Sequence, residues 1–222
     1  MTMNGSRPHV ILNSAMSLDG KIATKRRESR LSSQQDLKRV HRLRSSVDGI
    51  MVGLGTILAD DPKLTTKYYR GRNPTRIVVD GLARTPAGAY VVKTARKIPT
   101  IIAVTSKAPA GNIRRLKKMG VMVLVCGRGK LVSLPMLMKS VMRLGIRKIL
   151  LEGGGTLNWN MLTQGFVDEV SIAVSPLIIG GEEAVTLVEG EGVERVEDAV
   201  KLRFTKARSY GADIVLSYEV LD

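Results

Sequence analysis

Cysteine, histidine and aromatic residues are scarce in this sequence of 222 residues. Its single cysteine, Cys126, excludes a disulfide framework and a site built from several cysteines, and it suits a reducing compartment. The two histidines, His9 and His41, lie far apart in the sequence, so we expect no metal site. Phe, Trp and Tyr together make up 4% of the residues, which leaves few side chains on which nucleic-acid bases could stack.

Long apolar runs are also missing. No apolar stretch reaches the roughly 18 residues that a membrane-spanning helix needs, and the N-terminus lacks the apolar core of a signal peptide. We therefore expect a cytoplasmic protein. Apolar residues still make up 44% of the chain, enough for a buried core, and no linker or internal repeat divides it. The prediction is one domain over residues 1–222.

Acidic residues are absent from the middle of the chain. Residues 81–151 contain 15 Lys and Arg residues and no Asp or Glu, so this segment carries the whole net charge of +15. Such a segment attracts anions, which include a phosphorylated cofactor, a phosphorylated substrate and nucleic acid. Helix faces whose charged side chains are merely solvated explain the same composition equally well.

Glycine, by contrast, is concentrated at one point. The apolar run 149–151 predicts a buried strand, Gly153-Gly154-Gly155 follows Glu152, and Leu157, Met161 and Leu162 then recur at helical spacing. Strand, glycines and helix together bring free backbone N–H groups to a phosphate, although the spacing matches neither the Rossmann nor the Walker motif. A tight turn that uses glycine only for its dihedral freedom is an equal alternative. Glu152 would lie where ligands gather in open α/β sheets.

Two further turns carry polar side chains that suit chemistry. Asp19 and Lys21 lie two residues apart where the chain leaves its first strand, although a surface Asp-Gly turn has the same pattern. Thr56 and Asp60 lie four residues apart on a short helix that Pro62 stops, so they share a face. That pair suits an amide or ribose group, or it belongs to a capped single turn.

Apolar runs alternate with helical patterns along most of the chain. Strands are predicted over residues 10–16, 49–53, 76–80, 100–104, 121–125, 149–151 and 167–174, and helices over 112–119, 133–144 and after a cap at Ser32 or Ser33, where Leu37, Val40, Leu43 and Val47 mark one face. This order predicts an α/β fold with a mainly parallel sheet and helices on both faces. Residues 202–208 and 213–220 predict an antiparallel C-terminal hairpin, and 180–198 an acidic loop.

The ordered set of motifs resembles the reductase of riboflavin biosynthesis, which has the dihydrofolate-reductase-like fold. The matching stretches are residues 17–23 (SLDGKIA), 52–56, 59–65 (ADDPKLT), 74–80 (PTRIVVD), 152–155 (EGGG), 167–170 and 176–181 (PLIIGG). Nothing resembles the H-x-E and P-C-x-x-C signature of the zinc deaminase that precedes this reductase in many bacteria. We therefore expect the stand-alone form, as in archaea and fungi.

The resemblance implies a reaction and its cofactor. NADPH would reduce the ribosylamino group of 2,5-diamino-6-ribosylamino-4(3H)-pyrimidinone 5′-phosphate to a ribitylamino group. Opening of the ribose ring gives an imine at C1′ that accepts hydride, so the protein must align donor and acceptor and assist proton transfer. The family's members are typically homodimers, and we expect one here.

The resemblance also implies roles for residues. Lys21 and Glu152 would contact the ribose and assist proton transfer, with Asp19 a weaker candidate that orients Lys21. The implied cofactor contacts are Ala15, Thr56, Asp60, Gly81, Leu82, Ala83, Arg84, Ser106, Gly153, Gly154, Gly155 and Thr156; Arg84 would pair with the 2′-phosphate, helped by Ser106 and Lys107. The implied substrate contacts are Asn13, Ser29, Arg44, Leu64 and Lys67. Lys67 replaces the usual bacterial arginine, and Arg30-Leu31 replaces a bacterial tryptophan near Ser29.

Two other functions are compatible with parts of the sequence. A dihydrofolate or pterin reductase on the same fold would need no sugar-phosphate clamp, so Arg44 and Lys67 would be idle surface residues. A basic nucleic-acid-binding module would use the 81–151 segment. No aromatic residue lies among Arg114, Arg115, Lys117 and Lys118, so such binding would be non-specific and would weaken steeply with salt.

Overall fold

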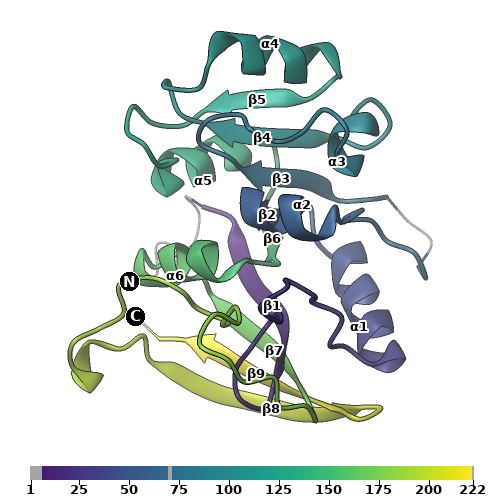
Figure 1. The fold of residues 1–222 in the computed structure, drawn as a ribbon, viewed down its shortest axis with the longest axis vertical. Coiled ribbons are helices and arrows are strands. Elements are labelled where there is room, and N and C mark those ends of the chain that lie inside the picture. Colours follow the sequence, from purple (N-terminus) through teal and green to yellow (C-terminus); the bar gives the residue numbers. More distant parts are fainter. Residues whose placement is uncertain (1–6, 70–71, 222) are drawn as a thin grey trace. The chain divides into compact units, whose positions relative to one another are not determined.

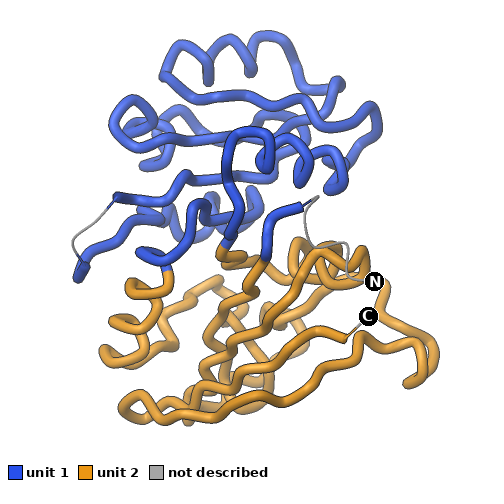
Figure 2. The backbone as a smooth tube through the Cα atoms, turned by 180° about the vertical axis from the view of Figure 1, so that it is seen from behind, with its two compact units in different colours: residues 1–9, 44–149 blue, residues 10–43, 150–222 orange. Residues whose placement is uncertain are grey.

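The chain forms two compact units in the computed structural model, which describes residues 7–69 and 72–221 (Figure 2). Unit 1 comprises residues 1–9 and 44–149, and unit 2 comprises residues 10–43 and 150–222. The chain therefore passes from one unit to the other after residues 9, 43 and 149. Of the domain predicted over 1–222, residues 1–6, 70, 71 and 222 lie outside the described residues.

Unit 1 contains four parallel strands in the order β5-β4-β3-β2 (Figure 1). The strands are β2 (Gly49–Gly53), β3 (Thr75–Val79), β4 (Thr100–Val104) and β5 (Met122–Val125), and the helices are α2 (Leu54–Asp60), α3 (Tyr90–Lys93), α4 (Ala110–Lys118) and α5 (Leu134–Arg143). Continuous apolar runs form β2, β3 and β4 because strands of a parallel sheet are buried on both faces. The carboxyl ends of parallel strands share one edge, so the loops after β3, β4 and β5 emerge together.

One charged side chain lies inside unit 1. Arg76 of β3 is fully buried and donates to the hydroxyls of Thr94 and Thr100 and to the carbonyls of Val91 and Ile98. Burial lowers the pKa of its guanidinium to about 10. These bonds tie β3 to the short helix α3, which the sequence analysis missed because four residues are too few to show a helical period.

Unit 2 contains β1 (His9–Ser17, whose first residue belongs to unit 1), β7 (Glu169–Ser175), β8 (Leu202–Tyr210) and β9 (Asp213–Val220) in the order β1-β7-β9-β8. β1 and β7 pair in parallel, whereas β7 with β9 and β9 with β8 pair in antiparallel fashion. Its helices are α1 (Gln34–Ser45, whose last two residues belong to unit 1), α6 (Gly155–Thr163) and the short η1 (Val196–Asp198). Strand β6 (Lys148–Leu151) begins in unit 1 and ends in unit 2. The predicted fold, mainly parallel with a C-terminal antiparallel hairpin, is confirmed.

Helix α1 packs through polar rather than apolar residues. Ser33 is its cap, since the Ser33 hydroxyl accepts the Asp36 N–H at 3.2 Å. Asp36 is completely buried and forms a salt bridge of 2.6 Å with Arg39, while Leu37, on the face that the sequence pattern marks as apolar, is 43% exposed. Arg39 also donates to Asn13 and Ser171, which face each other on β1 and β7. This buried network attaches α1 to the sheet of unit 2, while Val40 and Leu43 of the predicted apolar face are half-buried.

Among the described residues, no helix has the length and apolar character needed to cross a lipid bilayer.

Candidate active site

The glycine turn lies in unit 2, between β6 and α6. After the half-buried Glu152, Gly153 adopts a positive φ of 90°, the Gly153–Gly154 peptide is cis, and Gly154 precedes the first residue of α6. The first backbone hydrogen bond of the helix runs from the Asn158 N–H to the Gly154 carbonyl. The N–H groups of residues 155–157 precede that bond, so they have no acceptor within the helix and carry the positive end of its dipole. An anion is therefore favoured at this helix start.

The three glycines do not serve one purpose. The positive φ of Gly153 is a conformation that side-chain-bearing residues rarely adopt. A Cβ on Gly155 would lie 2.7 Å from the Thr186 carbonyl oxygen and 2.8 Å from Glu189 Cγ. The chain's own packing thus requires glycine at position 155, independently of any ligand. Close packing therefore accounts for the glycine at position 155. Phosphate binding stays a prediction for the backbone N–H groups of the whole turn.

The 184–190 segment, Ala184 to Gly190, lies beside the turn that carries Lys21. The Ile22 N–H donates to the Val185 carbonyl at 2.8 Å, and the Leu187 N–H donates to the Gly20 carbonyl at 3.2 Å. Lys21 itself forms an isolated antiparallel bridge with Thr186, and its Nζ donates to the Ala184 carbonyl at 3.4 Å. The segment was predicted as part of an acidic loop, and the structure shows that it is pinned along its length.

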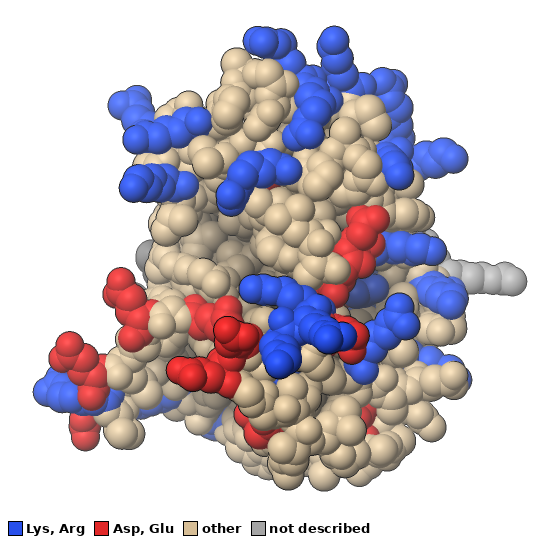
Figure 3. Space-filling view, in the orientation of Figure 1, with Lys and Arg blue, Asp and Glu red and all other residues tan. Residues whose placement is uncertain are grey.

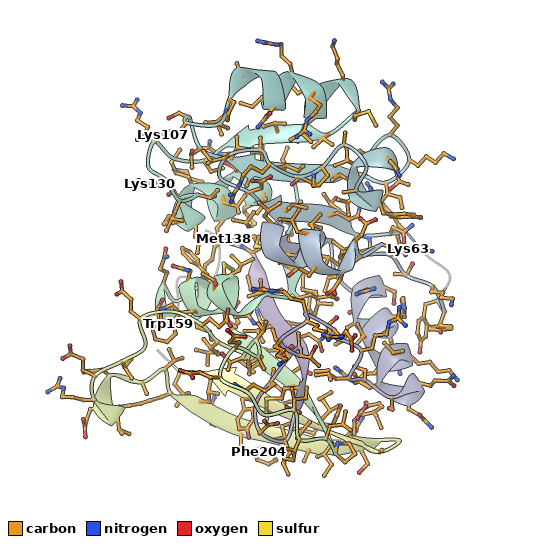
Figure 4. The ribbon with its side chains drawn as sticks, in the orientation of Figure 1. Lys63, Lys107, Lys130, Met138, Trp159 and Phe204 are labelled. Carbon is orange, nitrogen blue, oxygen red and sulfur yellow. The ribbon has the colours of Figure 1, made fainter. Side chains whose placement is uncertain are left out.

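The same segment is also fixed to helix α6. The Asn158 side-chain Nδ2 donates to the Leu187 carbonyl at 2.9 Å, and a Cβ on Gly190 would lie 2.1 Å from Trp159 Cδ1. Figure 4 labels Trp159 on α6. The 184–190 segment therefore joins the Lys21 turn to the helix that begins at the glycines. The fully buried Asn158 was not predicted from the sequence. The only pattern that could have indicated it is an amide side chain on the helical face that carries Leu157 and Met161.

Asp19 is exposed, yet three donors hold its carboxylate. It accepts hydrogen bonds from the Ser17 hydroxyl at 2.6 Å, the Ile179 N–H at 3.0 Å and the Gly180 N–H at 2.7 Å. These bonds, that of Ser17 foremost, lower the pKa of Asp19 from 3.8 to about 2. Ser17 also accepts the Lys21 N–H at 3.0 Å, so Asp19 and Lys21 are linked through this hydroxyl.

The other expected residues of unit 2 differ in their surroundings. Asn13 is buried, and its Oδ1 accepts a hydrogen bond from Arg39 at 2.9 Å. Ala15 is half-buried on β1, opposite Ala173 of β7, and Ser29 is exposed in the loop that leads to α1. Thr156 is exposed on the first turn of α6.

In unit 1, the turn after β3 is held from within. The buried Asp80 carboxylate accepts both the N–H and the hydroxyl of Thr85 at 2.7 Å, and Thr105 donates its N–H and hydroxyl to the Gly81 carbonyl. Ala83 is buried in a left-handed conformation with φ of 54°. Leu82 and Arg84 project outward as exposed residues.

Exposed cations follow the carboxyl ends of neighbouring strands in unit 1. Arg84 follows β3, Lys107 and the exposed Ser106 follow β4, and Lys130 follows β5. A Cβ on Gly81 would lie 2.9 Å from the Lys130 carbonyl oxygen, which places the Lys130 backbone against the β3 turn. Lys107 and Lys130 are labelled in Figure 4 on this side of the unit. Lys130 was missed, although Gly127-Arg128-Gly129-Lys130 directly after a parallel strand is a usable signal.

The remaining expected residues of unit 1 lie on α2 and in the loop that follows it. Thr56 is half-buried and Asp60 exposed on the same short helix, as predicted from their spacing. The Arg44 guanidinium donates to the Thr65 carbonyl at 3.3 Å, which brings Arg44 to the loop that contains Leu64 and Lys67. Leu64 is buried with φ of 51°, and the exposed Lys67 has its Nζ 5.4 Å from the Tyr68 ring centroid.

Charge is unevenly distributed between the units. Figure 3 shows Lys and Arg side chains over the surface around α4 of unit 1, and Asp and Glu side chains near the segment that carries η1 of unit 2. Within residues 7–69 and 72–221, no three His, Cys, Asp or Glu residues form a group that could hold a metal ion. The electrostatics of unit 1 therefore favour anionic ligands.

Comparisons with known proteins identify the family. Residues 8–216 match the model of the RibD C-terminal domain. A protein of Methanothermobacter thermautotrophicus named 2,5-diamino-6-ribosylamino-4(3H)-pyrimidinone 5′-phosphate reductase is 45% identical, over 96% of this chain and 99% of its own length. An Aquifex aeolicus protein with the same name is 37% identical, over 97% of this chain and 98% of its own.

Solved structures agree on the fold. The structure of Acinetobacter baumannii RibD superimposes with a TM-score of 0.84 and 22% identity, over 99% of this chain and 59% of that chain. The present chain thus spans about three-fifths of that structure. The motifs of the first strand turn, the β3 strand and the glycine turn all fall within the matched residues 8–216. The chain therefore belongs to the RibD C-terminal domain family, the reductase family that its motifs resemble.

Proposed function

We propose that the protein uses NADPH to reduce the ribosylamino group of 2,5-diamino-6-ribosylamino-4(3H)-pyrimidinone 5′-phosphate to a ribitylamino group in riboflavin biosynthesis. The observation that carries this proposal is the 45% identity, over 99% of its length, to the archaeal reductase named for that substrate. The basic surface of unit 1 supports a phosphorylated ligand. No feature of the described residues favours a dihydrofolate or nucleic-acid ligand over this one.

Two parts of the chain fit a dinucleotide. Membership in a reductase family points to a nicotinamide cofactor, and the free N–H groups at the start of α6 suit its pyrophosphate. We assign Gly153, Gly154, Gly155 and Thr156 to that group, and Ala15, Thr56 and Asp60 to neighbouring contacts. When bound, the nicotinamide supplies the hydride.

The choice of NADPH over NADH rests on the turn after β3. Arg84 is exposed there, and its guanidinium makes no hydrogen bond or ion pair within the described part of the chain. We assign it to the 2′-phosphate, with Gly81, Leu82 and Ala83 forming the turn and Ser106 and Lys107 beside it. An exposed guanidinium on a turn that hydrogen bonds hold in place suits a terminal phosphate.

Lys21 and Glu152 are the proposed catalytic residues. Lys21 can donate a proton from its ammonium group, and Glu152 follows β6 directly before the glycine turn. The 184–190 segment fixes the Lys21 turn, so the ammonium is held in place before substrate arrives. Asp19 is a positioning residue, because its pKa of about 2 keeps it ionised and its oxygens are engaged by Ser17, Ile179 and Gly180.

The substrate's 5′-phosphate is assigned to two cations of unit 1. Arg44 reaches the loop that contains Leu64 and Lys67, so a guanidinium and an ammonium serve the same loop. Ser29 is a further proposed contact, and Asn13 would act at the substrate through the amide hydrogens that Arg39 does not engage. Lysine in place of arginine at position 67 supplies charge without a bidentate grip.

At larger scale, we propose that both units work as one reductase domain, since each unit is assembled from two separate stretches of chain. We further propose a cytoplasmic homodimer. Size-exclusion chromatography with light scattering would test the dimer, and a monomeric mass at assay concentrations would contradict it.

The proposed function is tested by NADPH oxidation, followed by absorbance with three substrates in parallel. We expect turnover with the ribosylaminopyrimidine phosphate and none with dihydrofolate. The rate with the deaminated pyrimidine measures how strongly the enzyme prefers the substrate that keeps its amino group. Turnover with dihydrofolate alone would refute the proposal.

The catalytic assignment is tested with Lys21→Ala and Glu152→Ala. Each should lower kcat by about 10²- to 10⁴-fold, the usual contribution of a general acid or base, with unchanged NADPH affinity. Lys25→Ala and Glu182→Ala, both at exposed positions, are the matched controls and should keep full turnover. If Lys21→Ala and Glu152→Ala behave like these controls, the assignment is wrong.

A further inference from the structure

We propose that Arg115 of α4, assisted by Asn112, is a positioning residue that sets the shape of the β3 turn and thereby the selectivity for a 2′-phosphorylated nucleotide. One Arg115 guanidinium nitrogen donates to the carbonyls of Ala83 and Thr85, at 3.1 and 2.9 Å. The Asn112 side chain donates to the Leu82 carbonyl at 3.3 Å. This inference rests on the proposed function, because it concerns how the proposed cofactor is chosen.

The three accepting carbonyls surround the residue assigned to the phosphate. They belong to positions 82, 83 and 85, so the side chains of α4 hold the backbone on both sides of Arg84. Arg84 itself takes no part in this arrangement, and its guanidinium remains available. The direction in which Arg84 projects is thus decided by residues about 30 positions later in the chain.

The turn needs such support because its backbone is not in a relaxed conformation. Ala83 has φ of 54°, in the left-handed region that a residue with a Cβ rarely occupies. Asp80 and Thr105 fix the turn from the strand side, through Thr85 and Gly81. Without Arg115 and Asn112, the carbonyls of residues 82 and 83 would lose these partners, and the stretch around Arg84 could relax to another backbone conformation.

The contacts also explain why Arg115 differs from its neighbours in the basic helix. Arg114, Lys117 and Lys118 are exposed, whereas Arg115 is half-buried with its Nε inaccessible to solvent. A guanidinium is planar and weakly hydrated, so it suits a half-buried position against backbone carbonyls better than a compact, strongly hydrated lysine ammonium. One member of the basic segment therefore has a structural purpose, and its charge adds positive potential beside Arg84.

The test measures nucleotide binding to the full-length protein by calorimetry, with 2′,5′-ADP and 5′-AMP as probes. We expect Arg115→Ala to weaken 2′,5′-ADP binding about tenfold and to leave 5′-AMP binding unchanged. Arg115→Lys should recover part of the loss, and Asn112→Ala should show a smaller loss of the same kind. Arg114→Ala is the matched control, because it removes the same charge from the same helix without touching the turn, and its loss should stay below about twofold.

Two readouts separate positioning from general damage. The amides of residues 82–85 should exchange with solvent faster in Arg115→Ala than in Arg114→Ala, while those of β4 should not change. In turnover assays, KM for NADPH should rise while kcat is retained. Arg115→Lys and Asn112→Ala decide the matter if Arg115→Ala does not fold.

The outcomes distinguish this inference from the proposed function. If Arg84→Ala abolishes the preference for 2′,5′-ADP but Arg115→Ala, Arg115→Lys and Asn112→Ala do not alter it, the positioning role is overturned and the cofactor assignment stands. If Arg84→Ala leaves the preference for 2′,5′-ADP intact, the β3 turn does not bind the 2′-phosphate. Both the positioning role of Arg115 and the assignment of Arg84 to that phosphate are then wrong. Equal loss of affinity for both probes in Arg115→Ala also overturns the inference.

Discussion

The Asp19 carboxylate combines an exposed position with a strongly lowered pKa. Its oxygens accept from a hydroxyl and from two successive backbone N–H groups, and such bonds favour the ionised form. A group with a pKa of about 2 is a poor proton donor at neutral pH. At the scale of single residues, Asp19 is therefore an anchor that ties the Lys21 turn to the loop at Ile179 and Gly180.

We predict that this anchor fails only in strong acid. Because the folded-state pKa lies below the ordinary value of 3.8, the contribution of Asp19 to stability is complete above about pH 4 and is lost as the pH falls through about 2. In NMR titrations, the amide signals of Ile179 and Gly180 should move with a midpoint near pH 2.

The variant Asp19→Asn provides the control for that titration. It has no ionisable group at this position, so the same two amide signals should stay constant over this range. A wild-type midpoint near 3.8 would show that the three hydrogen bonds do not persist in solution.

The sequence predicts the positions of single residues better than it predicts the partners that they contact. The Asp19–Lys21 turn and the shared helical face of Thr56 and Asp60 follow from local spacing, which a sequence displays directly, whereas the role of Arg84 is implied only by the family resemblance. The partners of those residues do not, because Ile179 approaches Asp19, and Arg115 approaches Ala83, only through the tertiary fold. The same holds for Asn13, whose oxygen is engaged by Arg39.

At the scale of elements, the 184–190 segment connects the Lys21 turn with helix α6, which begins at the glycine turn. It pairs with the Lys21 turn on one side and contacts Gly155, Asn158 and Trp159 of α6 on the other. A displacement of this segment would therefore be transmitted both to the proposed proton donor and to the proposed pyrophosphate site.

We predict that Gly155→Ala is destabilising. The added methyl group would meet the Thr186 carbonyl at 2.7 Å and Glu189 Cγ at 2.8 Å, and such overpacking usually costs about 1–3 kcal/mol. The free energy of unfolding, measured by urea denaturation, should fall accordingly. Trp159 is the only tryptophan and lies against Gly190, so its fluorescence reports on the segment.

Gly111→Ala is the matched control for this prediction. Gly111 also lies in the first turn of a helix, but a Cβ there meets no atom within 4 Å. Alanine at this position should be neutral or raise stability by about 0.4–1 kcal/mol, because it restricts the unfolded chain. Equal effects of the two substitutions would mean that position 155 is not closely packed.

Elements with a distinct local pattern were predicted correctly, including the short strands β5 and β6, whereas elements without one were missed. The strands of unit 1 contain continuous apolar runs and the helices α4 and α5 show a helical period, and the predicted positions of both agree with the structure. The helix α3 and the 184–190 segment have too few regular residues for a period, so their structure depends on partners elsewhere in the chain. For α1, periodicity correctly indicated a helix, and Val40 and Leu43 of its apolar face are half-buried, but periodicity gave no sign of the buried salt bridge between Asp36 and Arg39.

At the scale of the whole molecule, the net charge of +15 is carried by the 81–151 stretch, almost all of which belongs to unit 1. Most of these cations lie at exposed positions, so they act through long-range attraction rather than through fixed contacts. Their expected effect is on the rate at which anions arrive.

We predict that kcat/KM for the phosphorylated substrate falls several-fold as ionic strength rises from low to above physiological values, whereas kcat changes little. Screening shortens the range of attraction and slows association, but it does not alter the bound complex. Steady-state assays over a series of salt concentrations, with a neutral osmolyte as control, measure the effect. A kcat that fell in parallel with kcat/KM would contradict steering as the cause.

The way the chain alternates between the two units has a consequence for how the protein folds while it is being translated. Residues 10–43 of unit 2 emerge from the ribosome before the 44–149 stretch of unit 1, and residues 150–222 emerge after both. Strand β1 is therefore translated well before β7, with which it pairs in parallel. During that interval unit 1 can begin to fold, while the nascent β1 keeps an unpaired edge that a chaperone, or a second unfinished chain, is free to capture.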